Sequence, residues 1–237
     1  MQAFAFIEKL RSLGRPMFSV TDAERIIDKP RSYIRIYLHR LERKGLILRV
    51  ERGKYLLRDA DPLILSTSLV TPSYISFLFA FYLHGLTTQI PRSIQVVSPS
   101  SKKRVLSNEI EVEFVKFAPK SIFGYQKRVV RGGYAFVAEK EKAVIDCLYY
   151  KRNIVSFSDI LNAIPECDID KLVIYALRMD SSAVVQRLGY LLSLNNIPIP
   201  RSLKKRVGKN HVLLNVALPR KGEYVSEWNL IVNEAIQ

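Results

Sequence analysis

The sequence contains few of the residues that bind metals or form disulfide bridges. Its only cysteines in 237 residues, Cys147 and Cys167, lie 20 positions apart and form no C-x-x-C pair. His39, His84 and His211 are scattered and match no zinc-ligand spacing. This pattern excludes a disulfide-stapled secreted domain and a zinc finger. We expect no metal and no cofactor, and two apolar thiols in a reducing, cytoplasmic compartment.

Charged residues are absent from one long stretch, Pro62–Pro91, which raises the question of a membrane span. Pro72 interrupts the stretch, and its apolar part, Tyr74–Leu83, has Thr71 as a candidate N-cap and Gly85 as a stop. A helix of roughly 13 residues is about 20 Å long, shorter than the ~30 Å hydrocarbon core of a bilayer. We therefore predict a buried core helix and no membrane partner. The first residues of the chain also lack the hydrophobic segment and cleavage site of a signal peptide.

Acidic residues are missing from residues 181–222, which contain 8 Lys/Arg and no Asp/Glu. Residues 1–59 are also basic, with 14 Lys/Arg against 7 Asp/Glu. The rest of the chain balances, so these two segments hold the whole formal charge of +15. Such uneven placement favours a polyanionic partner, most simply nucleic acid, over a charged surface that has no partner.

Sequence signatures of common enzymes are absent as well. There is no G-x-S-x-G, H-E-x-x-H or Walker A pattern. The Gly132-Gly133 pair lies between two extended segments and favours a hairpin over a phosphate-binding loop. Glu141 and Asp146 are five positions apart, which does not stack them on one helix face. We expect no enzyme, with a nuclease that uses Glu141 or Asp146 as an alternative.

The stretch Thr21–Leu57 has the outline of two helices and a hairpin. Thr21 and Glu24 form a capping box, which predicts a short helix over Asp22–Asp28. Pro30 begins a second helix, and Gly45 ends it. Three apolar residues of the second helix recur at i, i+4 and i+7 and are expected on one buried face: Ile34, Leu38 and Leu41.

The segments after the second helix read as two strands, Leu46–Val50 and Lys54–Leu57, joined by a basic turn. A helix, a turn, a cationic helix and a basic hairpin predict a winged helix-turn-helix, in which the second helix enters the DNA major groove. The alternative is a helix-hairpin module that binds protein. The candidate DNA-contacting residues on the helix are Arg31, Ser32, Tyr33, Arg35 and His39. Those on the wing, facing the backbone or minor groove, are Arg49, Arg52 and Lys54.

The first residues of the chain complete this module. Residues 3–14 predict a helix with Phe4, Ile7 and Leu10 on one side, and Pro16–Val20 predicts a short extended piece beside the wing. The turn-rich junction Leu57–Pro62 is the expected domain boundary. It divides the chain into a DNA-binding domain, residues 1–59, and a second domain, residues 60–237.

The second domain reads as α+β, with strands first and helices after them. The expected strands are Ser93–Ser98, Ile110–Phe117, Tyr125–Arg131, Tyr134–Ala138, His211–Leu218 and Trp228–Val232. The expected helices are Glu139–Lys151, Phe157–Ile164, Ile169–Met179 and Ser182–Leu194. Between them lies a basic loop with a short helix at most, and its cationic residues are Arg201, Lys204, Lys205, Arg206 and Lys209. Because few aromatics are interleaved, this cluster favours contact with phosphate or with an acidic protein over base stacking.

Three stretches of the second domain resemble a known family: SYISFLFAFYLHGLTTQIPRSIQVVS (73–98), EKEKAVIDCL (139–148) and QRLGYLLSL (186–194). Together with the GKY at Gly53–Tyr55, they are similar to AbiEi-type antitoxins of type IV toxin–antitoxin systems. The resemblance covers nearly the whole chain, and most of its motifs are packing motifs. Lys142 departs from the family, whose members often have Arg in a similar E-R-T motif.

The resemblance implies a two-part function. The winged module would bind inverted repeats in double-stranded DNA of its own promoter, with a dimer on a palindromic site, and repress transcription. The second domain would neutralise a toxin of nucleotidyltransferase fold. The alternatives are a one-component regulator whose second domain binds a small ligand, and a structural adaptor without DNA affinity.

Overall fold

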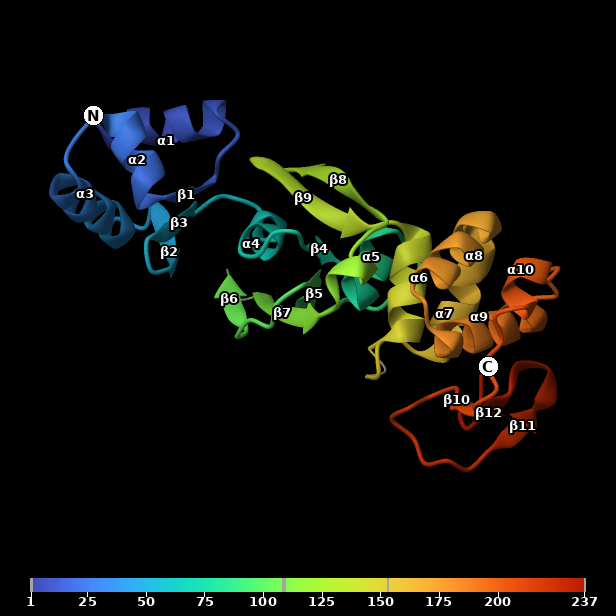
Figure 1. The fold of residues 1–237 in the computed structure, drawn as a ribbon. Coiled ribbons are helices and arrows are strands. Elements are labelled where there is room, and N and C mark those ends of the chain that lie inside the picture. Colours follow the sequence, from blue (N-terminus) through green and yellow to red (C-terminus); the bar gives the residue numbers. More distant parts are fainter. Residues whose placement is uncertain (1, 108–109, 153, 237) are drawn as a thin grey trace.

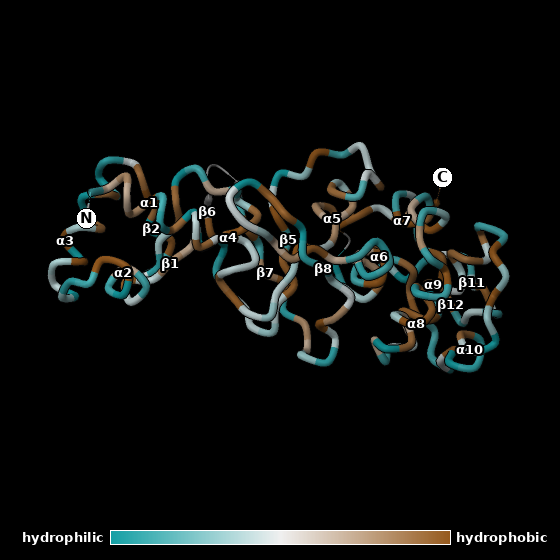
Figure 2. The backbone as a smooth tube through the Cα atoms, turned by 90° about the horizontal axis from the view of Figure 1, so that it is seen from above, coloured by the Kyte–Doolittle hydropathy of each residue, from teal (hydrophilic) through white to brown (hydrophobic). Residues whose placement is uncertain are grey.

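The chain forms an elongated molecule with different structures at its two ends. The computed structural model describes residues 2–107, 110–152 and 154–236. A small helical module with a hairpin lies at one end, a sheet lies in the middle, and a helical layer follows it (Figure 1). A short C-terminal sheet lies at the other end, and the view from above shows the same order (Figure 2). This α+β arrangement confirms the predicted fold class.

The N-terminal module is the predicted winged helix-turn-helix. Its elements are α1 (Ala3–Ser12), β1 (Met17–Ser19), α2 (Val20–Ile27), α3 (Arg31–Arg43), β2 (Ile47–Glu51) and β3 (Lys54–Leu57). The strands form one antiparallel sheet in the order β1-β3-β2. Ile34, Leu38 and Leu41 are buried as expected. Pro30 lies at the N-cap of α3, one position before the expected place, and Gly45 follows the helix end with φ +67°.

The predicted start of α2 is wrong by a few residues. The helix begins at Val20, and its capping box joins Ser19 to Asp22, in place of Thr21 and Glu24. Ser19 is the last residue of β1 and pairs with Lys54 of β3, so its extended backbone puts its hydroxyl over the helix start. Burial raises the pKa of Asp22, but the Ser19 hydrogen bonds outweigh it and hold the pKa below the ordinary value.

We expect Ser19→Ala to lower the free energy of unfolding by about 1 kcal/mol, because the Asp22 amide loses its acceptor and the Asp22 carboxylate loses the Ser19 hydroxyl as a donor. Thr21→Ala is the matched control, since Thr21 is exposed and lies inside the helix. The Asp22 carboxylate contributes to the free energy of unfolding above pH 3.8. This contribution is lost as the pH falls below that value, because folding lowers the pKa of this carboxyl. Urea denaturation at neutral and acid pH measures both effects. If Ser19→Ala and Thr21→Ala lowered the free energy of unfolding equally, the Ser19 capping box would be contradicted.

One core assignment in α1 is also wrong. Phe4 is 74% exposed, whereas Phe6 is fully buried. The Phe6 ring lies edge-on to Phe18 of β1 at 5.5 Å and to Tyr37 of α3 at 5.7 Å. Phe6 therefore joins α1 to both the sheet and the recognition helix, together with Ile7 and Leu10, which are buried as expected.

The second domain contains a mixed sheet of six strands in the order β6-β7-β5-β4-β9-β8. These strands are β4 (Tyr74–Ile75), β5 (Ser93–Ser98), β6 (Val105–Ser107), β7 (Ile110–Lys116), β8 (Tyr125–Val130) and β9 (Gly133–Ala138). The pairs β5–β7 and β4–β9 are parallel. The β8–β9 hairpin is confirmed, and it turns through Gly132 at φ +86°.

Four helices follow the sheet as predicted. They are α6 (Lys140–Tyr149), α7 (Phe157–Ala163), α8 (Ile169–Arg178) and α9 (Ser182–Leu194). Helix α6 packs against α5 (Phe77–Leu83), α8 and α9, so it lies at the centre of the helical layer. The core cluster of this domain includes apolar residues from the sheet and from all of these helices.

The uncharged stretch is organised differently from the prediction. It forms α4 (Pro62–Ser68), the short strand β4 and then α5, in place of one helix over Tyr74–Leu83. Tyr74 and Ile75 pair with β5, and Ile75 also pairs with β9, so the sheet satisfies their backbone groups. None of the helices in the described ranges is long and apolar enough to cross a membrane.

The C-terminal lobe consists of α10 (Arg201–Lys204) with the turn that follows it, and a sheet of β10 (Val212–Leu213), β11 (Glu223–Val225) and β12 (Leu230–Val232) in the order β10-β12-β11. The predicted strand His211–Leu218 is shorter, because the Asn215 side chain accepts a hydrogen bond from the amide of Ala217 and turns the chain. The strand β11 was not predicted. The predicted closing strand begins after Trp228, which ends a short 3-10 turn.

Helix α4 connects the two cores. Ile64, Leu65 and Leu69 belong to the buried cluster of the winged module, whereas Leu63 belongs to that of the second domain. A Cβ at Gly133, next to the β8–β9 turn, would lie 3.1 Å from Ile64. The hairpin therefore packs closely on α4, which holds the winged module against the sheet. The boundary between residues 59 and 60 stays a prediction.

Candidate nucleic-acid interface

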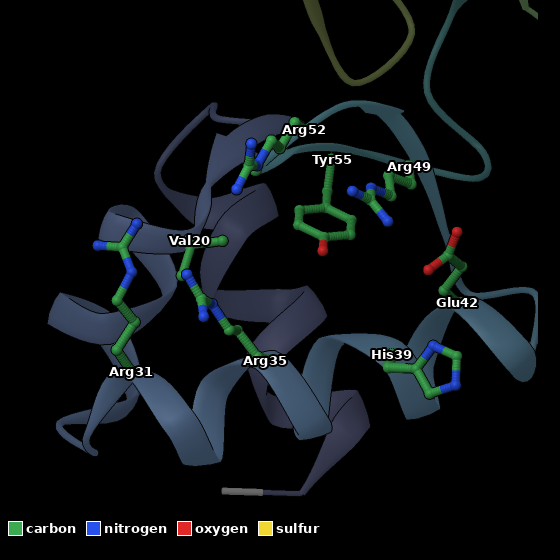
Figure 3. A pocket seen from close by; sticks show the side chains of 9 residues that line it. Val20, Arg31, Arg35, His39, Glu42, Arg49, Arg52 and Tyr55 are labelled. Atoms are coloured by element: carbon green, nitrogen blue, oxygen red, sulfur yellow. The ribbon is translucent and has the colours of Figure 1, made fainter.

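A cationic groove separates helix α3 from the wing. Its volume is about 570 Å3. Arg31, Arg35 and His39 recur every fourth residue along α3 and line one wall, while Arg49 and Arg52 of the wing line the other (Figure 3). The remaining lining residues are Val20, Glu42, Gly53 and Tyr55. Arginine side chains from two elements thus face one hollow that opens to solvent.

The local sequence explains why these side chains are exposed, and of them Arg31 also pairs with the Glu24 carboxylate at 3.5 Å. Burial of Ile34, Leu38 and Leu41 fixes the rotation of α3, so the arginines of the helix stay outside the core. On the wing, the register shifts between Arg49 and Glu51 and marks a bulge. Gly53 adopts φ +78°, which allows the tight turn that presents Arg52.

The structure brings together most of the predicted DNA-contacting residues. Arg31, Arg35, His39, Arg49 and Arg52 line the groove, and all are exposed. Three others lie outside its lining: Ser32, Tyr33 and Lys54.

Two of these three have partners inside the module. The Tyr33 ring stacks on the Tyr37 ring, with 6.3 Å between their centroids. The Lys54 ammonium lies 3.3 Å from the Glu51 carboxylate. We therefore assign both a weaker expected contribution to DNA contact than Arg35, Arg49 and Arg52.

The predicted contact set left out two residues on the outermost ridge of α3, Ile36 and Arg43. They recur with the predicted Ser32 and His39 at i, i+4, i+7 and i+11, so all four share the face opposite the buried one. Ile36 is 56% exposed, although it is a large apolar residue. An exposed apolar residue on a cationic helix was the available signal, because apolar side chains recognise the methyl group of thymine.

A lysine of the second domain contacts the wing. Lys102, in the loop between β5 and β6, forms an ion pair with Glu51. Burial raises the pKa of Glu51, but hydrogen bonds from Lys102 and Lys54 outweigh it and hold the pKa below its usual range. No sequence pattern predicted this pair, since its partners are far apart in the chain. It gives the wing a fixed attachment to the second domain.

The C-terminal basic cluster is a separate surface. Its cationic residues lie on α10 and the following turn, and all are exposed: Arg201, Lys204, Lys205, Arg206 and Lys209. Helix α10 lies at the opposite end of the molecule from α3 (Figure 1). The Lys204 ammonium is 2.9 Å from Glu227 and is thereby partly neutralised.

The two carboxylates considered for catalysis do not form a site. Glu141 accepts a hydrogen bond from the Asp168 amide at 3.0 Å, whereas Asp146 is fully buried in an ion pair with Lys142. Burial raises the pKa of Asp146 and lowers the pKa of Lys142, and their mutual attraction opposes both shifts. In the described ranges, no group of three or more His, Cys, Asp or Glu side chains has a metal-binding arrangement.

Comparison with known proteins supports the assignment of the N-terminal module. Residues 6–58 match the family model described as "Transcriptional regulator, AbiEi antitoxin". No match was found among curated proteins. The crystal structure of the RV2827C protein from Mycobacterium tuberculosis has a similar fold, with a TM-score of 0.61 and 13% identity over 96% of this chain and 91% of that chain. Within residues 6–58, the winged module of this chain is similar to that of the AbiEi antitoxin transcriptional regulators.

Proposed function

We propose that this protein represses transcription from its own promoter by binding double-stranded DNA through the winged module. The observation that carries the proposal is the groove in which Arg35 of the recognition helix faces Arg49 and Arg52 of the wing. A sugar-phosphate strand that passes between a recognition helix in the major groove and a wing beside it meets cations on both sides. Glu42 is the one acidic residue of this lining.

The groove and the ridge divide the contacts between phosphates and bases. Arg35, Arg49 and Arg52 face the hollow and would bind phosphate oxygens, which fixes the position of the protein on the duplex. Ser32, Ile36 and His39 point outward on α3 and would meet base edges, which gives sequence discrimination. A palindromic operator would then take two protomers, one on each half-site.

The second part of the proposal is an antitoxin role for the second domain. The family match over residues 6–58 supports it, because that family comprises antitoxin regulators. We propose a partner toxin of nucleotidyltransferase fold and no catalytic activity in this chain. Co-expression with the product of the neighbouring gene tests this: relief of growth arrest supports the role, and unrelieved arrest by a toxic neighbour contradicts it.

The wing contribution is measurable as a change in salt dependence. We expect Arg52→Ala to flatten the slope of log K against log[salt] by about 0.9, the value for one phosphate contact. Lys54→Ala should change it less, because Glu51 and Lys54 are already paired. The double variant combines both losses. Titration of the upstream DNA at several salt concentrations gives the slopes, and an unchanged slope in the double variant removes the wing from the contact set.

A further inference from the structure

The C-terminal lobe carries cations that have no described use in the fold. Arg201, Lys205, Arg206 and Lys209 are exposed, and none of them has an acidic partner within 4.0 Å among the described residues. The six-stranded sheet and the helical layer lie between this lobe and the winged module (Figure 1). The lobe is therefore a second basic surface that cannot serve the same DNA contacts as α3.

The fold brings aromatic rings to this cationic surface. The His211 and Tyr224 rings pack against each other at 4.7 Å, and Tyr224 is 45% exposed. The Tyr224 hydroxyl donates to Asn229 Oδ1 at 2.6 Å, and Asn229 Nδ2 donates to the Gly208 carbonyl at 2.9 Å. Two hydrogen bonds thus link Tyr224 to the residue before Lys209. The sequence showed few aromatic residues among these cations, because Tyr224 is distant from them in the chain.

The lobe is held in place by a buried glutamine of α9. The Gln186 amide donates to the carbonyls of Asn210, Trp228 and Asn229 at 3.0, 2.9 and 3.1 Å. Gly189, one turn later, leaves space for the Trp228 ring, which a Cβ at this position would overlap. The segment with the cations and the strand with the aromatic ring are therefore fixed relative to each other before any ligand binds.

We propose that this lobe binds a single-stranded polynucleotide. The arginines and lysines would contact phosphates, and the exposed ring pair of His211 and Tyr224 would stack on unpaired bases. Helix α10 has only four residues, too few to read a major groove as a recognition helix does. An acidic protein would use the charges but would leave the rings without a matching partner. The inference goes beyond the proposed promoter binding and does not depend on it.

The test uses the full chain with Arg35→Ala and Arg49→Ala, which removes the winged contribution. Fluorescence anisotropy measures binding of labelled oligo-U RNA, oligo-dT DNA and a DNA duplex, each of about 12 nucleotides or base pairs, within the usual site size. We expect at least one single strand to bind about tenfold more tightly than the duplex, because only unpaired bases can stack on the rings. Comparison of RNA with DNA then identifies the natural class of strand.

Two sets of variants measure separately how the cationic side chains and the aromatic rings contribute to strand binding. We expect Arg206→Gln with Lys209→Gln to weaken strand binding about tenfold at low salt, whereas Lys116→Gln with Lys127→Gln, which changes the charge equally on the sheet, should alter it less than about twofold. Tyr224→Leu should weaken it about tenfold, and Tyr224→Phe, which keeps the ring, should restore it. The emission of buried Trp228 checks that each variant is folded.

Three results would overturn the proposal. One is the absence of single-strand binding, and another is equal affinity for strand and duplex. The third is a loss in the charge variant but none in Tyr224→Leu, together with equal competition by polyglutamate, which would identify an acidic protein as the occupant.

Discussion

Replacing Arg35 and Arg49 by alanine is expected to weaken operator binding about a hundredfold at moderate salt, because each hydrogen bond from an arginine to a charged phosphate contributes about 1.5–3 kcal/mol. The two side chains lie on opposite walls of the groove, one on α3 and one on β2. A strand seated between them would lose a cation on each side. Anisotropy with the DNA upstream of the gene measures the change.

The matched control for this double variant is Lys9→Ala with Arg58→Ala. Both residues are exposed on the winged module, and neither lines the groove. The control removes the same net charge. Any loss of DNA affinity in the control therefore reports the long-range electrostatic field alone. Equal losses in the two double variants would show that the groove has no special role and that the duplex is attracted by net charge only.

Replacing Asp146 by alanine is expected to lower the free energy of unfolding of the second domain by about 3–5 kcal/mol, because it leaves a buried charge without its partner. Lys142 and Asp146 are both fully buried. The Tyr74 hydroxyl at 3.0 Å and the Ser76 hydroxyl at 2.7 Å also lose their acceptor. For a chain of this size, each kcal/mol of lost stability lowers the midpoint of thermal unfolding by about 2–4 °C, so we expect the midpoint to fall by about 10 °C. Emission of buried Trp228 reports the transition.

Two variants show whether the ion pair itself matters. Lys142→Met with Asp146→Asn leaves no charge in the core and keeps an acceptor for Tyr74, so we expect it to cost less than Asp146→Ala alone. Lys120→Ala breaks the exposed pair with Asp180 at 3.2 Å and should cost less than about 1 kcal/mol. An Asp146→Ala variant as stable as Lys120→Ala would contradict the structural role assigned to the buried network.

Local patterns in the sequence were sufficient for the winged module and for most helices. The spacing of Ile34, Leu38 and Leu41 fixes which face of α3 is buried, and that face determines where Arg35 and His39 point. The hairpin glycines likewise mark turns that need a positive φ. These features depend on residues within a few positions of each other, so the order of residues alone reveals them.

Features that depend on distant partners were not predictable. The strand at Tyr74 forms because β5 and β9 lie on either side of it, although the apolar pattern favours a helix. Glu51 of the wing pairs with Lys102 of the second domain, and Asn229 joins Tyr224 to Gly208. Phe4 and Phe6 are chemically equivalent, and only the tertiary packing of Phe6 distinguishes them.

The central claim is that a DNA duplex docks on α3 and the wing, with one strand in the groove between Arg35 and Arg49. Hydroxyl-radical footprinting of the full chain on the DNA upstream of its gene tests this most directly. The account predicts protected half-sites whose centres lie about 10 base pairs, or a multiple of that, apart. It also predicts that the Arg35→Ala, Arg49→Ala variant loses this protection. An unprotected upstream region, or protection that survives in the double variant, would contradict the claim.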